Sequence, residues 1–275
     1  MSDFPSLEQL RGKVQKDRHQ EIGNWLARRV ARPLAVYGTW VAIRLRLSAH
    51  QVTLGALLAN LLAAVALGAG ERWGVLLCAI LLHLGFWLDH VDGQVARWRG
   101  TAGVTGVYFD YLMHHLSGMA LGFALGMGLA VQTGNLAWPV AGFSISLGIT
   151  LLSLHNDCRY KAFFQRLKAS RGAFRVEGGA GGRPAPAPGW PRRGRAMLTW
   201  PLFKLCEPHM VLMAVSILAV LACLPGDSWL WAWQGYVGAL AVLSPCLGLA
   251  RVARSIQRNF PSTEFDQWFQ PVDLD

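Results

Sequence analysis

Residues 73–115 decide the fold, and they read WGVLLCAILLHLGFWLDHVDGQVARWRGTAGVTGVYFDYLMHH. The first part is an apolar run of about the length that a helix needs to cross roughly 30 Å of hydrocarbon. The second part carries Asp89, Asp92 and Asp110. Ionisable side chains near a membrane are costly and usually mark a functional site. The stretch therefore indicates a membrane helix that ends in a polar site, from which a second helix returns.

The rest of the chain has the same character. It has 275 residues, of which 53% are hydrophobic and 15% are charged, whereas about 25% are charged in a soluble domain. Backbone groups in lipid must be satisfied within their own segment, so each long apolar run is expected to be helical. We therefore predict an all-α integral membrane protein with a bundle of six transmembrane helices. The six runs cover residues 51–70, 73–91, 104–132, 136–155, 200–224 and 229–250.

The distribution of basic residues indicates the topology. The formal net charge is +10. The loops between successive apolar runs lie alternately on the two sides of the membrane, and Arg72 is the one Lys or Arg in a loop on the side opposite to the termini. The positive-inside rule then places both termini and the polar cluster on the cytoplasmic side, which we take to be that of the cytoplasmic (inner) membrane. Because topology explains the charge, no nucleic acid partner is expected. The first 20 residues are polar, so no cleavable signal is expected either.

Composition suggests the boundaries of the parts. Residues 1–50 mix basic and apolar positions, which is typical of a juxtamembrane amphipathic helix lying on membrane lipids. Residues 51–255 would form the six-helix domain, and residues 256–275 a cytoplasmic tail. Residues 169–196 are rich in Gly, Pro, Ala and Arg, so we predict a mobile cytoplasmic loop there.

A stripe of small residues lies in the third run. Gly118, Gly122 and Gly126 recur at four-residue spacing, which allows two helix backbones to approach closely. The sequence leaves open whether this contact lies within the bundle or between protomers.

The acidic cluster has the spacing of a metal site. Asp89 and Asp92 share one helix face, and Asp110 and His114 share another. A turn between the two helices would bring these faces together, and converging carboxylates repel unless cations lie between them. Oxygen ligands favour Mg²⁺, Ca²⁺ or Mn²⁺ over zinc. The alternative is that the aspartates only end helices or pair with Arg97 and nearby basic groups.

The same residues resemble a known signature, that of the CDP-alcohol phosphotransferases (CDP-alcohol phosphatidyltransferases), D-x2-D-G-x2-A-R-x8-G-x3-D-x3-D. Seven of its eight fixed positions match, namely Asp89, Asp92, Gly93, Ala96, Arg97, Gly106 and Asp110. The eighth, an Asp in the family, is His114 here. The start of the first helix, LSAHQVTLGALL, also looks like the family's P-N-x-x-T segment, with Thr53 retained.

The resemblance implies a homodimer of six-helix protomers and an enzyme of phospholipid biosynthesis. Such an enzyme transfers a substituted phosphoryl group from a CDP-alcohol donor, such as CDP-diacylglycerol, to a hydroxyl acceptor and releases CMP. By resemblance, one or two Mg²⁺ or Mn²⁺ ions would be held by Asp89, Asp92, Asp110 and His114. The CDP moiety would be bordered by Gly93, Ala96, Arg97 and Thr53.

The histidine at the last motif position leaves three interpretations open. In the family this position is the proposed base, and a neutral imidazole can also accept a proton or ligate a metal. We therefore expect His114 and Asp110 to be catalytic. In a second interpretation His115 or another residue takes this role. In a third, the site is degenerate, and the chain binds nucleotide or metal as a sensor or scaffold.

Other polar residues leave the acceptor undetermined. Asp157 or Glu207 could supply the carboxylate that the motif lacks. Basic residues such as Arg159 and Arg251 would suit a phosphorylated acceptor, whereas Glu207 and His209 would suit a neutral or cationic one. A transporter is disfavoured, because the acidic cluster lies at one surface of the membrane and not at its midplane.

Overall fold

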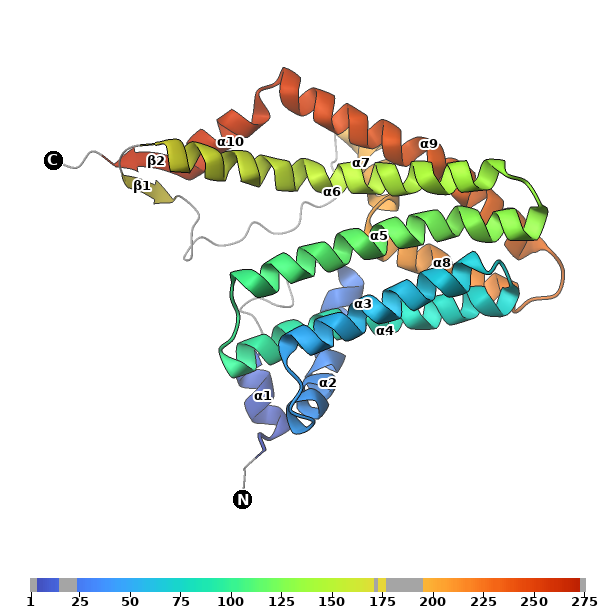
Figure 1. The fold of residues 1–275 in the computed structure, drawn as a ribbon, viewed down its shortest axis with the longest axis horizontal. Coiled ribbons are helices and arrows are strands. Elements are labelled where there is room, and N and C mark those ends of the chain that lie inside the picture. The colour runs from blue at the N-terminus through green and yellow to red at the C-terminus, as the bar shows by residue number, and fades with distance from the viewer. Residues whose placement is uncertain (1–3, 15–23, 171–172, 177–194, 273–275) are drawn as a thin grey trace.

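The computed structural model describes residues 4–14, 24–170, 173–176 and 195–272, and nearly all of them are helical (Figure 1). The N-terminal elements are α1 (Leu7–Val14), the π-helical turn η1 (Ala27–Ala31) and α2 (Arg32–Arg44). The long helices are α3 (Ala49–Gly68), α4 (Arg72–Arg99), α5 (Val104–Thr133), α6 (Ala137–Ala169) and α9 (Ser228–Gln257). The remaining elements are β1 (Ala173–Val176), α7 (Arg195–Leu205), α8 (Pro208–Ala222), α10 (Phe260–Trp268) and β2 (Phe269–Val272).

Within the described residues, the five long helices are each long and apolar enough to cross a membrane. A sixth span results only if α7 and α8 are counted together, and these two helices meet at a bend of 68°. Pro208 is the first residue of α8, and proline cannot donate the backbone hydrogen bond that would continue α7. The all-α membrane class is confirmed, while the count of six spans remains a prediction.

Particular residues fix the ends of the helices around the site. Ser48 and Gln51 form a capping box at the start of α3, which satisfies two backbone donors that the helix leaves free. Gly100 ends α4 with a φ of 66°, a left-handed conformation that glycine adopts without steric cost. The chain therefore turns sharply after α4 and enters α5 at Val104.

The glycine stripe packs inside the bundle. A Cβ atom at Gly122 would lie 2.7 Å from Oγ of Ser146, and one at Gly126 would meet a backbone carbonyl and Gly142 of α6. α5 therefore approaches α6 closely along this stripe, which settles the open alternative in favour of contact within the protomer. Large buried side chains, among them Leu129 and Trp233, fill the centre of the bundle.

The N-terminal helices cross the end of the bundle where α4 ends (Figure 1). α2 packs on α4 through small and branched residues, which include Ala35, Ala42, Val91 and Val95. α1 buries Leu10 against α2 and the end of α4. These segments are helical, whereas their position at a membrane interface remains a prediction.

The segment that the sequence assigned to a C-terminal tail contains regular structure. Residues 260–268 form α10, and β2 pairs antiparallel with β1, with Ala173 opposite Val272. Aromatic rings join these elements to α6, with Phe163 at 5.6 Å from Phe265 between ring centroids. Residues 173–176 of the predicted mobile loop are thus a strand, and residues 171–172 and 177–194 lie outside the described part. The predicted domain boundaries remain predictions.

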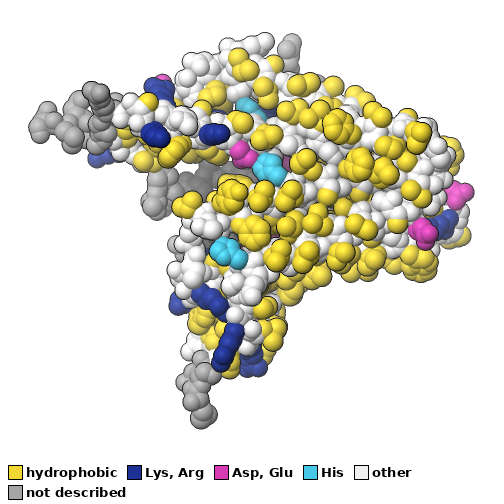
Figure 2. Space-filling view, viewed as in Figure 1, with side chains coloured by type: hydrophobic (Ala, Val, Ile, Leu, Met, Phe, Trp, Pro, Cys, Tyr) yellow, Lys and Arg dark blue, Asp and Glu magenta, His cyan; other side chains and the backbone are white. Residues whose placement is uncertain are grey.

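The surface agrees with a membrane protein. Hydrophobic side chains cover the long helices, and most Lys and Arg side chains gather at the end that carries α1, α2 and the end of α6 (Figure 2). The opposite end carries a smaller charged group, in which Arg72 lies 3.4 Å from Asp227. This arrangement is what an apolar belt between two aqueous surfaces requires.

Candidate active site

The turn after α4 brings together side chains from α4 and α5. Nε2 of His114 lies 3.4 Å from Oδ1 of Asp89 and 3.3 Å from Oδ1 of Asp110. One ligand atom from each of these three residues lies within 4.8 Å of the others. Asp110 and His114 are one helical turn apart, so α5 presents both toward Asp89 on α4. The structure therefore assembles two carboxylates and one imidazole from the predicted set.

The chemistry of this group fits a divalent cation. Oδ1 of Asp89 is buried, and its contact within the described residues is the 3.4 Å approach of Nε2 of His114, which is too long or poorly aligned to count as a hydrogen bond; a buried polar atom normally has a closer partner. The two carboxylates are ligands that Mg²⁺ and Mn²⁺ prefer, whereas the imidazole is a ligand more typical of transition metals. Among the described residues, this is the one group of three or more His, Cys, Asp or Glu side chains with metal-ligand geometry.

Asp92, the remaining predicted ligand, lies outside this group of three. Its Oδ2 accepts a hydrogen bond of 2.6 Å from Oγ1 of Thr53 on α3. The same hydroxyl lies 3.0 Å from the carbonyl of Ala49. Thr53 and Asp92 are 5% and 9% exposed, so water does not replace this bond. Thr53 thus contacts an aspartate of the motif, and its predicted contact with CDP stays a prediction, as does metal binding by Asp92.

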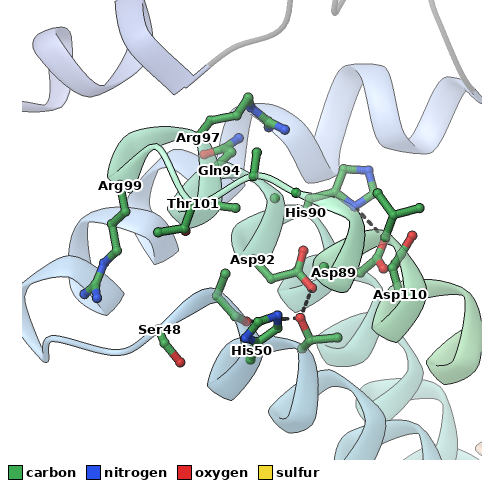
Figure 3. A pocket seen from close by; sticks show the side chains of 18 of the residues that line it. Ser48, His50, Asp89, His90, Asp92, Gln94, Arg97, Arg99, Thr101 and Asp110 are labelled. Atoms are coloured by element: carbon green, nitrogen blue, oxygen red, sulfur yellow. Dashed lines mark hydrogen bonds and ion pairs between the residues drawn. The ribbon is translucent and has the colours of Figure 1, made fainter.

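A cavity of about 710 Å³ opens beside these residues. Its lining includes every predicted site residue except His114, namely Thr53, Asp89, Asp92, Gly93, Ala96, Arg97 and Asp110. Asp89 and Asp110 lie together at one side of the cavity, and Arg97 and Arg99 lie toward the other (Figure 3). The cavity therefore has an acidic side and a basic side, as a ligand with a metal-bound diphosphate would require.

The lining also contains residues that the motif did not indicate. Arg32 of α2 reaches the cavity, together with His50, His90, Gln94 and Thr101. Burial, with a smaller contribution from Arg28, lowers the pKa of the Arg32 guanidinium from its ordinary value. The sequence signal for Arg32 was only its place in a basic amphipathic segment. Arg32 lies far from the motif along the chain, so spacing could not have found it.

His115 and Asp157 lie together at a different place. Nε2 of His115 is 3.0 Å from Oδ2 of Asp157 on α6, and its Nδ1 is 2.7 Å from the carbonyl of Tyr111. A ring nitrogen that faces a carbonyl carries the proton. Neither residue is part of the group of Asp89, Asp110 and His114.

The other residues that the sequence suggested for binding the acceptor also have hydrogen-bond or ion-pair partners. Glu207 lies 2.6 Å from Lys204 and 3.3 Å from His209. Arg159 of α6 pairs with Glu264 of α10 at 3.0 Å, and these two side chains are mostly buried. Arg251 donates to Asn156 at 3.4 Å. These polar residues thus pair with one another, and none of them belongs to the group of Asp89, Asp110 and His114.

Comparison with known families agrees with the motif. Residues 46–176 match the family model described as CDP-alcohol phosphatidyltransferase, a family of transferases, and this segment is just under half of the chain. The predicted resemblance is therefore confirmed, and the match contains the motif, the cavity's acidic side and Thr53. A comparison with curated proteins found no match.

Proposed function

We propose that the chain transfers a substituted phosphoryl group from a CDP-linked alcohol to a hydroxyl acceptor and releases CMP. The observation that carries this proposal is the group of Asp89, Asp110 and His114 beside a cavity with a basic opposite side. The group lies within the segment that matches the transferase family. Asp89, Asp110 and His114 would hold Mg²⁺ or Mn²⁺, and Asp92 would complete a second site if two ions bind.

The reaction would proceed as follows. The acceptor oxygen attacks the β-phosphorus of the donor, and the bond from that phosphorus to the bridging oxygen breaks, so the oxygen leaves with CMP. The acceptor's proton passes to a side chain of the site, for which Asp110 and His114 are the two candidates. When bound, the divalent ion supplies charge stabilisation for the diphosphate and the departing CMP. Arg97 would contact the diphosphate from the basic side, and Gly93 and Ala96 would border the cytidine.

His114 has one ring nitrogen directed at both carboxylates, and this limits its role. Neutral imidazole has a single lone pair available at Nε2, so that atom cannot bind metal and accept a proton at the same time. We propose that Nε2 of His114 ligates the ion and that Asp110 takes the proton. The proximity of Nε2 to Asp89 and Asp110 supports this assignment.

A second groove supports a lipid-linked donor. An apolar groove of about 490 Å³ lies between the N-terminal helices and α4, and its lining includes Leu34, Phe86 and Trp87. Phe86 contacts His90 of the first cavity, with ring centroids 4.9 Å apart. An acyl chain in the groove would therefore leave its headgroup beside the site, which fits CDP-diacylglycerol and a role in phospholipid biosynthesis.

Topology and assembly complete the proposal. We place the site and both termini at the cytoplasmic face of the inner membrane, with α7 and α8 together as the sixth span. The concentration of Lys and Arg at the site's end of the molecule supports this placement. The homodimer rests on the family resemblance.

The experiment that tests the proposal is CMP release by purified protein with CDP-diacylglycerol, Mg²⁺ or Mn²⁺, and a panel of alcohols. Wild type is compared with Asp89→Asn, His114→Ala and the matched control His115→Ala. Acceptor-dependent CMP release that His114→Ala loses and His115→Ala retains would support the assignment. Metal-dependent binding of CDP without turnover, with CDP-choline and CDP-ethanolamine donors as well, would instead support the non-catalytic sensor or scaffold.

A further inference from the structure

The guanidinium of Arg97 is fixed by the N-terminal helix α1. Its Nε donates a 2.6 Å hydrogen bond to the backbone carbonyl of Val14, which is the last residue of α1. Carbonyls in the last turn of a helix have no partner within the helix, and that end carries partial negative charge. The bond therefore joins a charged donor to an acceptor that α1 leaves available.

The remaining nitrogens of Arg97 lie over the motif glycine. A Cβ atom at Gly93 would lie 3.3 Å from Nη1 of Arg97, so the absent side chain leaves room for the guanidinium itself. Arg97 lines the cavity on the side that lies toward Arg99 and away from Asp110 (Figure 3). With Nε held by Val14, the two terminal nitrogens keep a fixed direction relative to the acidic side.

α1 is itself held firmly against the site. Leu10 and Val14 are fully buried, and Trp40 and Trp98 pack around them. Nζ of Lys13 lies 4.6 Å from the centre of the Trp98 ring, which follows Arg97 directly in sequence. α1 thus contacts both Arg97 and its neighbour on α4, although it lies outside the segment 46–176 that matches the family.

We propose that α1 is a positioning element for the donor: it holds Arg97 over Gly93 so that the guanidinium faces the donor's diphosphate. This inference rests on the proposed function. An arginine without such an anchor loses rotamer freedom only when the ligand binds, which weakens binding. Undocking α1 should therefore weaken donor binding while leaving the acceptor and the metal ligands in place.

The test uses the full chain with Leu10→Asp, which places a charge in the buried face of α1. The matched control is Gly12→Asp, because nothing lies within 4 Å of a Cβ atom added at Gly12. We expect Leu10→Asp to raise the KM for CDP-diacylglycerol about tenfold, as loss of one charge-assisted contact predicts. The acceptor KM should change less than about twofold, and Gly12→Asp should behave as wild type.

A double variant separates positioning from general destabilisation. If α1 acts through Arg97, adding Leu10→Asp to Arg97→Ala should not raise the donor KM further. Arg97→Lys, which keeps the charge but loses the fork geometry, should restore part of the affinity that Arg97→Ala loses. A wild-type donor KM in Leu10→Asp, or effects that multiply in the double variant, would overturn the proposal.

Hydrogen exchange of the amides in residues 7–14 gives a readout that does not depend on turnover. Arg97→Ala should speed exchange in α1, and Arg99→Ala should leave it unchanged. Unchanged exchange in Arg97→Ala overturns the role of α1 whether or not the protein is active. Wild-type protein that shows neither turnover nor CDP binding counts against the proposed function itself and, with it, against this inference.

Discussion

Replacing Thr53 by valine removes one hydroxyl from the site and little else. Valine keeps the branched shape of threonine, and the change deletes the 2.6 Å hydrogen bond to Asp92. That length is typical of a bond from a hydroxyl to a carboxylate. A hydrogen bond to a charged group contributes about 1.5–3 kcal/mol, which corresponds to roughly 10- to 100-fold in rate or affinity. We therefore expect kcat/KM to fall by about that factor.

The assay is initial-rate CMP release at several Mg²⁺ concentrations, with Thr53→Ser as the matched control because serine keeps the hydroxyl. Thr53→Ser should remain within about threefold of wild type, since only a methyl group is lost. The two variants should elute as wild type from size-exclusion chromatography. Kinetics of Thr53→Val that match wild type at every Mg²⁺ concentration would refute the reasoning, because Asp92 would then work without its partner.

Three further predictions concern the metal, the packing and the C-terminal segment. EDTA should abolish CMP release and Mn²⁺ should restore it. In calorimetry, His114→Asp should bind Mn²⁺ more tightly than wild type, because it adds a charged oxygen ligand. Equal affinity would argue against metal ligation by the side chain at position 114. Gly126→Leu should lower the melting temperature, since overpacking costs about 1–3 kcal/mol, and Gly235→Leu, with nothing within 4 Å of an added Cβ, should not. Glu264→Ala leaves Arg159 buried without its carboxylate and should speed proteolysis after residue 258, whereas an unchanged cleavage rate would show that the pair does not hold α10.

The sequence predicted the parts of the fold that depend on local pattern. Apolar run lengths located the starts of the long helices to within a few residues, whereas α4, α6 and α9 continue well past the predicted ends of their runs. Run length alone could not show the bend at Pro208, because α7 and α8 together have the composition of one span. The pairing of β1 with β2 depends on two segments that are far apart in sequence, and neither has a strong strand pattern.

In the candidate site too, the sequence predicted what depends on local pattern and missed contacts between distant segments. Helical spacing and a turn were enough to predict that Asp89 and Asp110 converge, because both residues lie close to that turn. The partner of Asp92 is on a different helix, and periodicity within one segment cannot find it. The contact between Arg97 and Val14 involves a backbone carbonyl, which leaves no signal in a sequence.

Gly126 and Gly142 hold α5 and α6 close together near one end of α6. A small tilt of α6 at that point would therefore give a large movement at its other end. From that contact α6 runs 27 residues to Ala169, which is about 40 Å at 1.5 Å per residue, and it diverges from α5 toward the site (Figure 1). A tilt of about 5° at the glycines would move the far end by about 3.5 Å at that rise. The pair of His115 and Asp157 joins α5 to α6 between that contact and Ala169. Because α6 also packs along α9 and α10, the distance between α5 and α6 next to the site depends on several contacts, and spin labels on the two helices would measure how far it changes.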